Sequence, residues 1–263
     1  MSLCSIDNAS GNLTGCANVR SGFNNINGIV VSSDSKLAYI SNYGNSTMSI
    51  CNITAGTGAL TGCGFTGGSF NGPNGMVIAD IAGFSFTSNY NGASVTACNV
   101  TAGTGAWSGC RAISGFNGPA GVAMSGSYLY VSNFNGGNVA QCNITASSGA
   151  VTVDGCFTLS GFGGPQQISI RGSHFYVAEY FNSQVRRCDI GPATGEIVNC
   201  GPTGNNIASP FGLAVTATHA YIGNHGAGTV TRCEVVPGNG TLTNCYLTGS
   251  GFNQPYNIAI AYV

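Results

Sequence analysis

The stretch Ser94-Val95-Thr96-Ala97-Cys98-Asn99-Val100-Thr101-Ala102-Gly103-Thr104-Gly105-Ala106-Trp107-Ser108-Gly109-Cys110 decides the fold of this chain. It contains two runs rich in β-branched and apolar residues, separated by the turn sequence Thr-Ala-Gly-Thr-Gly. Such runs favour β-strands, and a glycine-rich segment between them favours a tight reversal of the chain. The stretch therefore predicts a β-hairpin that carries one cysteine on each strand.

This cysteine hairpin recurs along the whole chain. The six pairs are Cys4/Cys16, Cys51/Cys63, Cys98/Cys110, Cys142/Cys156, Cys188/Cys200 and Cys233/Cys245. Their first members follow one another at steps of 47, 47, 44, 46 and 45 residues. A period of this size is typical of repeat architectures in which each repeat is one structural unit.

Two further strands precede each hairpin. In the repeat at 73–110, residues 73–79 form a continuous apolar run, and residues 84–89 alternate between apolar and polar. The first pattern suits a strand buried on both faces, and the second suits a half-buried strand. Four antiparallel strands in about 46 residues is the pattern of one propeller blade.

These counts predict an all-β, six-bladed β-propeller with four-stranded antiparallel blades, formed as a single domain over residues 1–263. Six inner strands are expected to begin near Ile26, Pro73, Pro119, Pro165, Pro210 and Pro255. The N-terminal hairpin (3–20) and the C-terminal strand (255–263) are expected to meet in one composite blade that closes the ring and removes exposed sheet edges. Only five clear second strands are present, which leaves one unaccounted for.

The cysteine spacing predicts six disulfides, each joining the third and fourth strands of its blade. Directly opposed residues of an antiparallel pair lie within the reach of a disulfide. Eleven intervening residues (thirteen in one repeat) match no zinc spacing, and no further His or Cys completes a ligand set within a repeat. Paired cysteines indicate an oxidising compartment, so we expect a secreted, periplasmic or cell-surface protein.

Composition excludes several classes of partner. Only 6% of the 263 residues are charged, the net charge is −1, and no stripe of Lys and Arg is present. Nucleic-acid binding requires clustered cations to neutralise phosphates, so we expect no nucleic-acid partner. No run of about 20 apolar residues exists, so we expect no membrane span. No cofactor is expected.

Two sets of residues are expected at one mouth of the central channel, where propeller loops gather. The first set follows the start of each inner strand: Asn27, Asn74, Ala120, Gln166, Phe211 and Tyr256. These residues vary while their neighbours repeat, which is expected either of a specificity surface or of neutral drift at exposed loops. The second set ends the second strands: Tyr43, Tyr90, Phe134, Glu179-Tyr180 and His225. Its aromatic rings are suited either to stacking on a sugar or to packing between blades.

Glu179 and His225 depart from the pattern of the second set on successive blades. Together they offer a carboxylate and an imidazole, which can bind a metal or move a proton. Two groups are fewer than a metal site of this type requires, and the alternative is an isolated surface carboxylate and histidine. No Ser-His-Asp set is evident, so no catalytic residue is assigned.

Three phrases resemble the lactonase-type or "YVTN" β-propeller repeat family. They are Tyr130-Val131-Ser132-Asn133, Asn52-Ile53-Thr54 with Thr57-Gly58-Ala59-Leu60-Thr61, and Gly72-Pro73-Asn74-Gly75. The resemblance covers nearly the whole chain and implies the propeller fold. The family includes sugar-lactone hydrolases, surface-layer proteins and secreted bacterial proteins. Its enzymes often have seven blades, against the six counted in this chain.

We therefore expect a secreted or cell-surface binding scaffold with no catalysis of its own, whose ligand is a glycan, a protein or a wall component. The alternative is a lactonase-like hydrolase or lyase with its site at the channel mouth, which the resemblance and the pair Glu179 and His225 support. A structural surface-layer module is a third hypothesis, distinguished by self-assembly.

Overall fold

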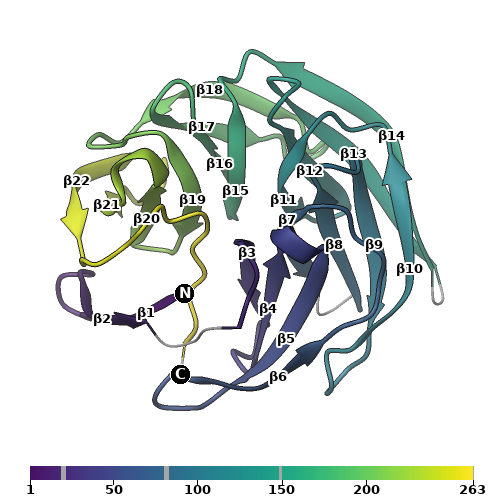
Figure 1. The fold of residues 1–263 in the computed structure, drawn as a ribbon. Coiled ribbons are helices and arrows are strands. Elements are labelled where there is room, and N and C mark those ends of the chain that lie inside the picture. The colour runs from purple at the N-terminus through teal and green to yellow at the C-terminus, as the bar shows by residue number, and fades with distance from the viewer. Residues whose placement is uncertain (19–21, 80–82, 148–149, 263) are drawn as a thin grey trace.

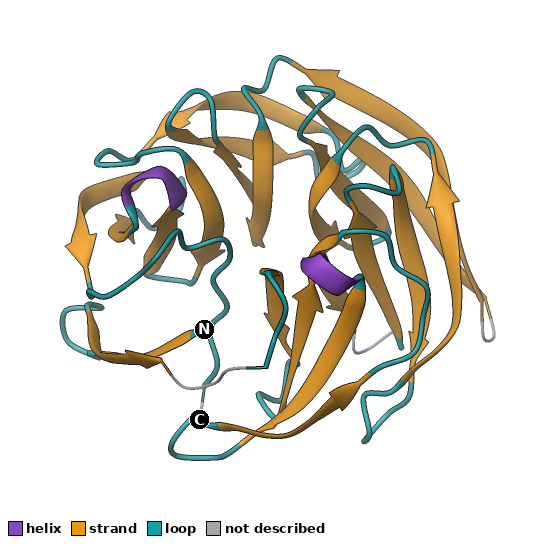
Figure 2. Ribbon diagram, viewed as in Figure 1, coloured by secondary structure: helices purple, strands orange, loops and turns teal. Residues whose placement is uncertain are grey.

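The computed structural model describes residues 1–18, 22–79, 83–147 and 150–262. Five four-stranded antiparallel sheets stand around a central axis, and the strands of each sheet run in chain order from the centre to the perimeter (Figure 1, Figure 2). We number these sheets blades 1 to 5. The described part of the chain also contains two 3-10 helices of three residues, too short to cross a membrane.

The strands of the five blades have the following bounds. Blade 1 contains β3 (Ile26–Val31), β4 (Leu37–Asn42), β5 (Thr47–Ile53) and β6 (Leu60–Phe65). Blade 2 contains β7 (Pro73–Ala79), β8 (Phe84–Asn89), β9 (Ser94–Val100) and β10 (Trp107–Ser114). Blade 3 contains β11 (Pro119–Ser125), β12 (Tyr128–Asn133), β13 (Asn138–Ser147) and β14 (Ala150–Ser160). Blade 4 contains β15 (Pro165–Arg171), β16 (His174–Glu179), β17 (Gln184–Ile190) and β18 (Ile197–Thr203). Blade 5 contains β19 (Pro210–Val215), β20 (His219–Asn224), β21 (Thr229–Val235) and β22 (Leu242–Thr248). The 3-10 helices η1 (Tyr43–Asn45) and η2 (His225–Ala227) follow the second strands of blades 1 and 5.

The prediction of six blades and of a composite closing blade was wrong. The N-terminal strands β1 (Ser2–Ile6) and β2 (Leu13–Asn18) form a separate two-stranded sheet. Residues 255–262 belong to no strand, while residues 19–20 and 263 of the predicted elements lie outside the described residues. The physical reason is the missing second strand: without it, no backbone ladder links a C-terminal inner segment to an N-terminal outer hairpin.

Side chains and loops, rather than a sheet, hold the two ends of the chain against the ring. The Tyr221 hydroxyl of blade 5 donates to the Gly11 carbonyl at 2.8 Å, which fixes the N-terminal hairpin beside that blade. The C-terminal segment passes close to β19, because a Cβ atom on Gly212 would lie 2.9 Å from the Cα atom of Asn257. Asn257 Nδ2 also donates to Gln167 Oε1 of blade 4 at 2.9 Å.

Blades 1, 3 and 4 each contact the hairpin of the next blade through a tyrosine of the second strand. The hydroxyls of Tyr39, Tyr130 and Tyr176 donate to the carbonyls of Gly105, Gly195 and Gly240 in the following hairpin, at 3.1, 2.6 and 2.6 Å. Burial raises the pKa of both Tyr130 and Tyr176 to about 12, so these phenols stay protonated and remain donors. In blade 2, Phe86 takes this place without a hydroxyl, and it faces the longer β13–β14 hairpin within one apolar cluster.

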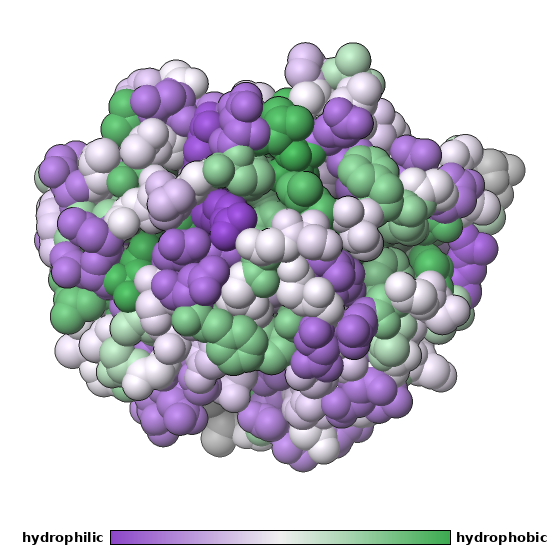
Figure 3. Space-filling view, turned by 90° about the horizontal axis from the view of Figure 1, so that it is seen from above, coloured by the Kyte–Doolittle hydropathy of each residue, from purple (hydrophilic) through white to green (hydrophobic). Residues whose placement is uncertain are grey.

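The perimeter of the ring is formed by the fourth strands, and it mixes apolar with hydrophilic surface (Figure 3). Its most exposed apolar side chains include Phe65 on β6, Phe157 on β14 and Leu247 on β22. Each fourth strand pairs on one side only, so its outer edge carries backbone groups with no strand beside them.

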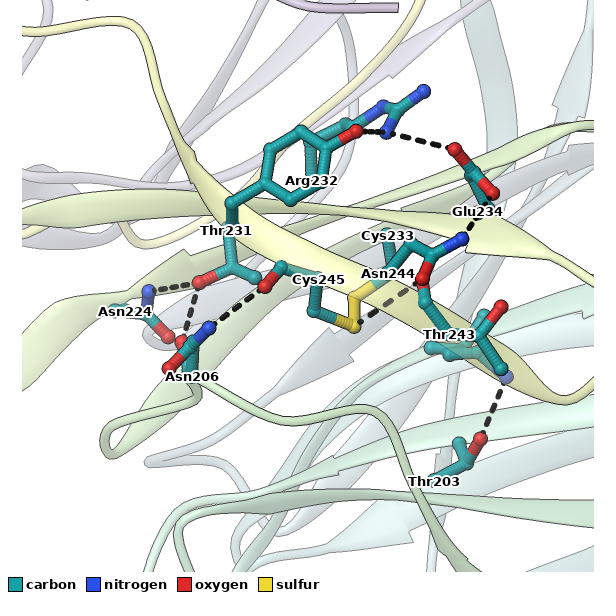
Figure 4. The surroundings of a disulfide bond; sticks show 12 residues. Thr203, Asn206, Asn224, Thr231, Arg232, Cys233, Glu234, Thr243, Asn244 and Cys245 are labelled. Atoms are coloured by element: carbon teal, nitrogen blue, oxygen red, sulfur yellow. Dashed lines mark hydrogen bonds and ion pairs between the residues drawn. A yellow bond between two sulfur atoms is a disulfide. The ribbon is translucent and has the colours of Figure 1, made fainter.

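All six predicted disulfides are confirmed, with the Cα atoms of each pair 4.0–4.1 Å apart. They are Cys4–Cys16, Cys51–Cys63, Cys98–Cys110, Cys142–Cys156, Cys188–Cys200 and Cys233–Cys245. Five of them join the third and fourth strands of a blade, as predicted, and Figure 4 shows the Cys233–Cys245 example. The Cys4–Cys16 bond differs from the prediction, because it joins β1 to β2 of the separate N-terminal sheet and belongs to no blade.

The expectation that the two cysteines of a pair lie directly opposite each other was wrong. The pairing register shifts at every pair, so each disulfide spans a β-bulge instead of a regular ladder position. The residue before each second cysteine has a left-handed backbone: φ is +57° at Gly15, +55° at Gly62, +56° at Gly109, +56° at Gly155, +52° at Asn199 and +47° at Asn244. Glycine and asparagine are the residues that tolerate this conformation, which explains why they recur there.

The two cysteines of a blade also differ in exposure, which the sequence pattern did not predict. The first members are buried: Cys51, Cys98, Cys142, Cys188 and Cys233. Of the second members, only Cys245 is buried. Cys63 and Cys110 are half-buried, Cys156 and Cys200 are exposed, and both Cys4 and Cys16 of the N-terminal sheet are half-buried. Each blade disulfide therefore connects a core position of the third strand to a strand at the perimeter.

Candidate functional site

A chain of aromatic rings lies at the mouth of the central channel where the inner strands begin. We call these seven residues the aromatic collar: Tyr43, Tyr90, Phe134, Tyr180, Phe211, His225 and Tyr256. Their ring centroids follow one another at 6.5, 6.2, 6.2, 5.0 and 4.5 Å as far as His225, and His225 lies 4.5 Å from Tyr256. The two sets predicted from the sequence thus meet at Phe211 and Tyr256, which join the rings that end the second strands.

On the blade 1 side of the collar, tyrosine hydroxyls are fixed by the neighbouring blade. Tyr43 donates to Asn91 Oδ1 at 3.0 Å, and Tyr90 donates to Asn135 Oδ1 at 2.9 Å. In the next repeat the tyrosine and its asparagine acceptor are both replaced by phenylalanine. Phe134 stands in place of the tyrosine and Phe181 in place of the asparagine, and their ring centroids lie 5.2 Å apart. These rings therefore form a rigid platform that spans the blade boundaries.

On the blade 5 side, the collar contains an imidazole with no hydrogen-bond partner. His225 packs against both Phe211 and Tyr256, which also contact each other at 4.9 Å, and its centroid lies 6.3 Å from that of Tyr180. Neither Nδ1 nor Nε2 has a hydrogen-bond partner among the described residues. Burial among the rings lowers the pKa of His225, so the imidazole is neutral at pH 7. We call Tyr180, Phe211, His225 and Tyr256 the His225 cluster.

Tyr256 completes the cluster as a protonated phenol. Burial raises its pKa, and the nearby phenols of Tyr180 and Tyr43 raise it further. Asn91 and Asn135 supply the acceptors for Tyr43 and Tyr90. The residue at the same repeat position opposite Tyr180 is Gly226, which has no side chain to hold the Tyr180 hydroxyl. The His225 cluster therefore combines a neutral base with phenol donors, within an apolar surround.

The remaining members of the first predicted set are buried and serve the contacts between blades. Asn27, Asn74 and Gln166 are between 4% and 9% exposed, and none of them joins the collar rings. The backbone carbonyls of Asn74, Ala120 and Gln166 accept hydrogen bonds from Ser41, Ser88 and Ser132 of the preceding blade at 2.9, 2.5 and 2.6 Å. We call this repeated contact the serine clamp.

The predicted cysteines contribute to the frame of the ring and not to the collar. Those of the fourth strands, such as Cys63 on β6, Cys156 on β14 and Cys200 on β18, lie at the perimeter, and Cys16 lies on β2 of the N-terminal sheet. The described residues include no free cysteine, so no thiol is available as a nucleophile or a metal ligand among them.

Glu179 is fully buried and takes the structural role that an asparagine has in the other blades. Its Oε1 accepts from the Gly163 backbone N–H at 3.1 Å, as Asn224 Oδ1 accepts from Ala208 at 3.0 Å. Its carboxylate also pairs with Arg186 at 3.1 Å and accepts from Gln184.

The presence of glutamate at position 179, where the other blades have asparagine, is explained by the donors around it. Asn224 Nδ2 donates to Thr229 and Thr231, which lie five and seven residues later. A carboxylate has no N–H to donate, so the same two positions become the donors Gln184 and Arg186 in blade 4. Comparing these offsets between repeats would have identified the role of Glu179 from the sequence.

Within the described ranges, the central channel and the collar contain no constellation suited to a metal ion. No group of three or more His, Cys, Asp or Glu side chains among the described residues is placed to hold one. Below the collar, a cavity of about 360 Å³ is lined by inner strands of all five blades and by residues of the C-terminal segment, including Ile258 and Ile260. Its lining residues carry no charged side chain.

No protein-family model matches the sequence, and no curated protein matches it. Solved structures do resemble this chain. A protein of Bacteroides uniformis, provisionally named a 6-phosphogluconolactonase, is 16% identical over 94% of this chain and 78% of its own, with a TM-score of 0.69. The periplasmic gluconolactonase PpgL of Pseudomonas aeruginosa is 13% identical over 97% and 80%, with a TM-score of 0.64. A chain of a nidogen/laminin complex is 11% identical over 98% and 94%, with a TM-score of 0.74. At these identities the likeness shows the fold alone: this chain is an all-β propeller of four-stranded blades, stapled by six disulfides.

Proposed function

We propose that the protein is a lactonase-like hydrolase that opens an uncharged sugar lactone at the His225 cluster. The observation that carries the proposal is the neutral imidazole of His225, which has no hydrogen-bond partner among the described residues and packs against two aromatic rings at the channel mouth. The two lactonase-named structures that share the fold support this reaction class. The sequence alone favoured a scaffold without catalysis, and the cluster is the reason to prefer the alternative.

The proposed reaction uses His225 as a general base. Its neutral nitrogen takes a proton from water as the water oxygen bonds to the lactone carbonyl carbon. The ring C–O bond then breaks, and the imidazolium returns the proton to the departing alkoxide, which leaves a hydroxy acid. The phenols of Tyr180 and Tyr256 are the donors available to stabilise the oxyanion that forms on the carbonyl oxygen.

The chemistry of the cluster favours an uncharged sugar over a phosphorylated one. Aromatic faces bind the C–H faces of sugar rings, whereas a phosphate requires Lys, Arg or backbone N–H donors. The guanidinium of Arg186 on blade 4 is already paired with Glu179. A phosphate at the collar would therefore lose its hydration without gaining a cation.

The test measures hydrolysis of glucono-1,5-lactone, above its spontaneous rate, by titrating the acid released. His225→Phe is the decisive variant, because Phe134 shows that a phenylalanine fits this position of the repeat. We expect a loss of at least about a hundredfold in kcat, the usual contribution of a general base. Tyr90→Phe, on the opposite side of the collar, is the matched control and should retain activity. Equal rates for His225→Phe and the wild type would overturn the proposal.

Glycan binding without catalysis is the second candidate function. The platform of Tyr43, Tyr90 and Phe134 favours it, since a small lactone at His225 leaves these rings free for further sugar units. A glycan array distinguishes the two functions: a scaffold would bind with and without the His225→Phe exchange and would hydrolyse no lactone. The six disulfides are consistent with an extracellular or periplasmic location for either function.

A further inference from the structure

A small pocket opens at the perimeter between blades 3 and 4, far along the sheets from the inner strands that carry the collar. It has a volume of about 190 Å³, and its lining includes the apolar side chains of Phe157, Leu159 and Val198, the amide of Gln141 and the carboxylate of Glu196. The perimeter near β14 and β18, at the top of Figure 1, faces the viewer in Figure 3 and shows apolar surface between hydrophilic patches. Phe157 and Val198 are exposed by 46% and 39%.

A buried amide with an unused acceptor distinguishes this pocket from an ordinary crevice. Gln141 is only 2% exposed, and its Nε2 donates to the Thr194 carbonyl of blade 4 at 2.9 Å. That bond fixes the orientation of the amide, because the opposite orientation would place two oxygens against each other. The Oε1 atom is left with no hydrogen-bond partner among the described residues.

The repeat shows that the unused acceptor is particular to blade 3. Blades 1 and 2 have the apolar residues Ile50 and Ala97 at this position. Blade 4 has Arg187 there, which contacts His174 and Asp189. A buried acceptor without a hydrogen-bond partner is normally destabilising. An apolar residue at position 141 would fit the repeat and avoid this cost. A buried, unpaired acceptor of this kind beside a largely apolar pocket, whose lining also carries Thr158 and the Glu196 carboxylate, indicates a ligand that completes its bonding.

We propose that this pocket binds one planar aromatic group that carries an N–H or O–H donor, with the donor directed at Gln141 Oε1. Apolar cavities of roughly 150 Å³ accept a benzene ring, so the volume suits a single ring or an indole. Phe157 and Leu159 provide the apolar walls, and aromatic residues are frequent anchors in protein interfaces.

The experiment titrates the full-length, oxidised protein with indole and with 1-methylindole, which has the same ring but no N–H donor. We expect indole to bind at least tenfold more tightly, as measured by calorimetry or by fluorescence competition. Gln141→Leu should reduce indole to the affinity of 1-methylindole, and Val198→Trp, which fills the pocket from its rim, should abolish both. His225→Phe is the control outside the pocket and should change neither affinity.

The comparison of the two ligands on the wild type keeps the inference testable even if Gln141→Leu fails to fold. Equal affinities for indole and 1-methylindole, or no binding of either, would overturn it. A Gly-Trp-Gly peptide separates two sources of the same group. Binding of the peptide at least as tight as indole assigns the pocket to a protein partner, and binding of free indole alone assigns it to a small molecule.

Discussion

Blades 1–3 and blades 4–5 are built from the same repeat but differ in the polar side-chain contacts that they make. The serine clamp occurs at Ser41, Ser88 and Ser132 in the first group, and its place is taken by Ala178 and Gly223 in the second. The side-chain ion pairs of the described residues lie in blades 4 and 5, apart from Lys36–Asp34. Serine hydrogen bonds thus link the blades of the first group, whereas the second group carries charged networks within its blades, next to the His225 cluster, and is linked by other neutral bonds such as that from Tyr176 to Gly240.

In blades 4 and 5, a histidine of each His–Arg network replaces an apolar or aromatic residue of the first three blades. His219 Nε2 lies 2.5 Å from Arg232 Nη2, and Arg232 also reaches Glu234 at 3.4 Å. Leu37, Phe84 and Tyr128 occupy the position of His219 in blades 1–3. The same fold therefore accommodates either an apolar residue or a charged network at this position, provided that all members of the network change together.

The largest effect is expected where a network is broken at a buried charge. Glu179→Asn restores the residue found in the other blades but leaves Arg186 and Gln184 without their acceptor. We expect a loss of about 3 kcal/mol in the free energy of unfolding, measured by urea denaturation, because a broken buried pair leaves an uncompensated charge.

The triple variant Glu179→Asn, Gln184→Thr, Arg186→Thr is the matched control, since it rebuilds the hydrogen-bond set of Asn224, Thr229 and Thr231. It should recover most of the lost stability. A single variant as stable as the wild type, or a triple variant no better than the single one, would contradict the structural role assigned to Glu179.

A smaller effect is expected at the serine clamp. Ser132→Ala removes the hydrogen bond to the Gln166 carbonyl and should cost about 1–2 kcal/mol. The reverse exchange, Ala178→Ser, introduces the clamp into blade 4 and should be stabilising by at most about 1 kcal/mol. Thermal melts of both variants in the same buffer test these two predictions. A melting temperature of Ser132→Ala equal to that of the wild type would show that the clamp is dispensable.

The smallest effect is a pH dependence confined to blade 5. Burial and the charge of Arg232 lower the pKa of His219 below 6.5, while Glu234 acts in the opposite direction; Thr218 also contacts the ring. The unfolded chain then binds more protons than the folded one, so stability falls as the pH drops through 6.5. His225 acts in the same direction.

Melting temperatures measured between pH 8 and pH 5 test this dependence. His219→Leu, which places the residue of blade 1 in blade 5, should flatten the profile, and His225→Phe should flatten it further. A profile that is unchanged in both variants would mean that other groups control the acid response.

The strands and disulfides were predictable because each repeats at a fixed offset. Five inner strands begin at the predicted residues Ile26, Pro73, Pro119, Pro165 and Pro210. The predicted number of blades was wrong because it rested on six hairpins and six inner strands, although only five second strands were evident. A blade requires that strand to connect its inner and outer parts.

The candidate site was predictable only in part. The position of His225 and the aromatic residues at the channel mouth follow from the repeat. Their joining with Phe211 and Tyr256 depends on how two loops meet in space, which the spacing does not give. The burial of Glu179 does not follow from that residue alone, and it becomes evident only when the offsets to its partners Gln184 and Arg186 are compared between repeats.

The bulge beside each disulfide also affects how one molecule meets another. An outer strand with an unpaired edge is a template on which a second molecule can add a strand, and natural sheets usually oppose this with charge. With 6% charged residues, this chain has little charge to use. A left-handed residue and a covalent cross-link at every outer edge twist the backbone away from a regular ladder. We therefore expect the cysteine repeat that sets the fold also to oppose edge-to-edge pairing at the perimeter.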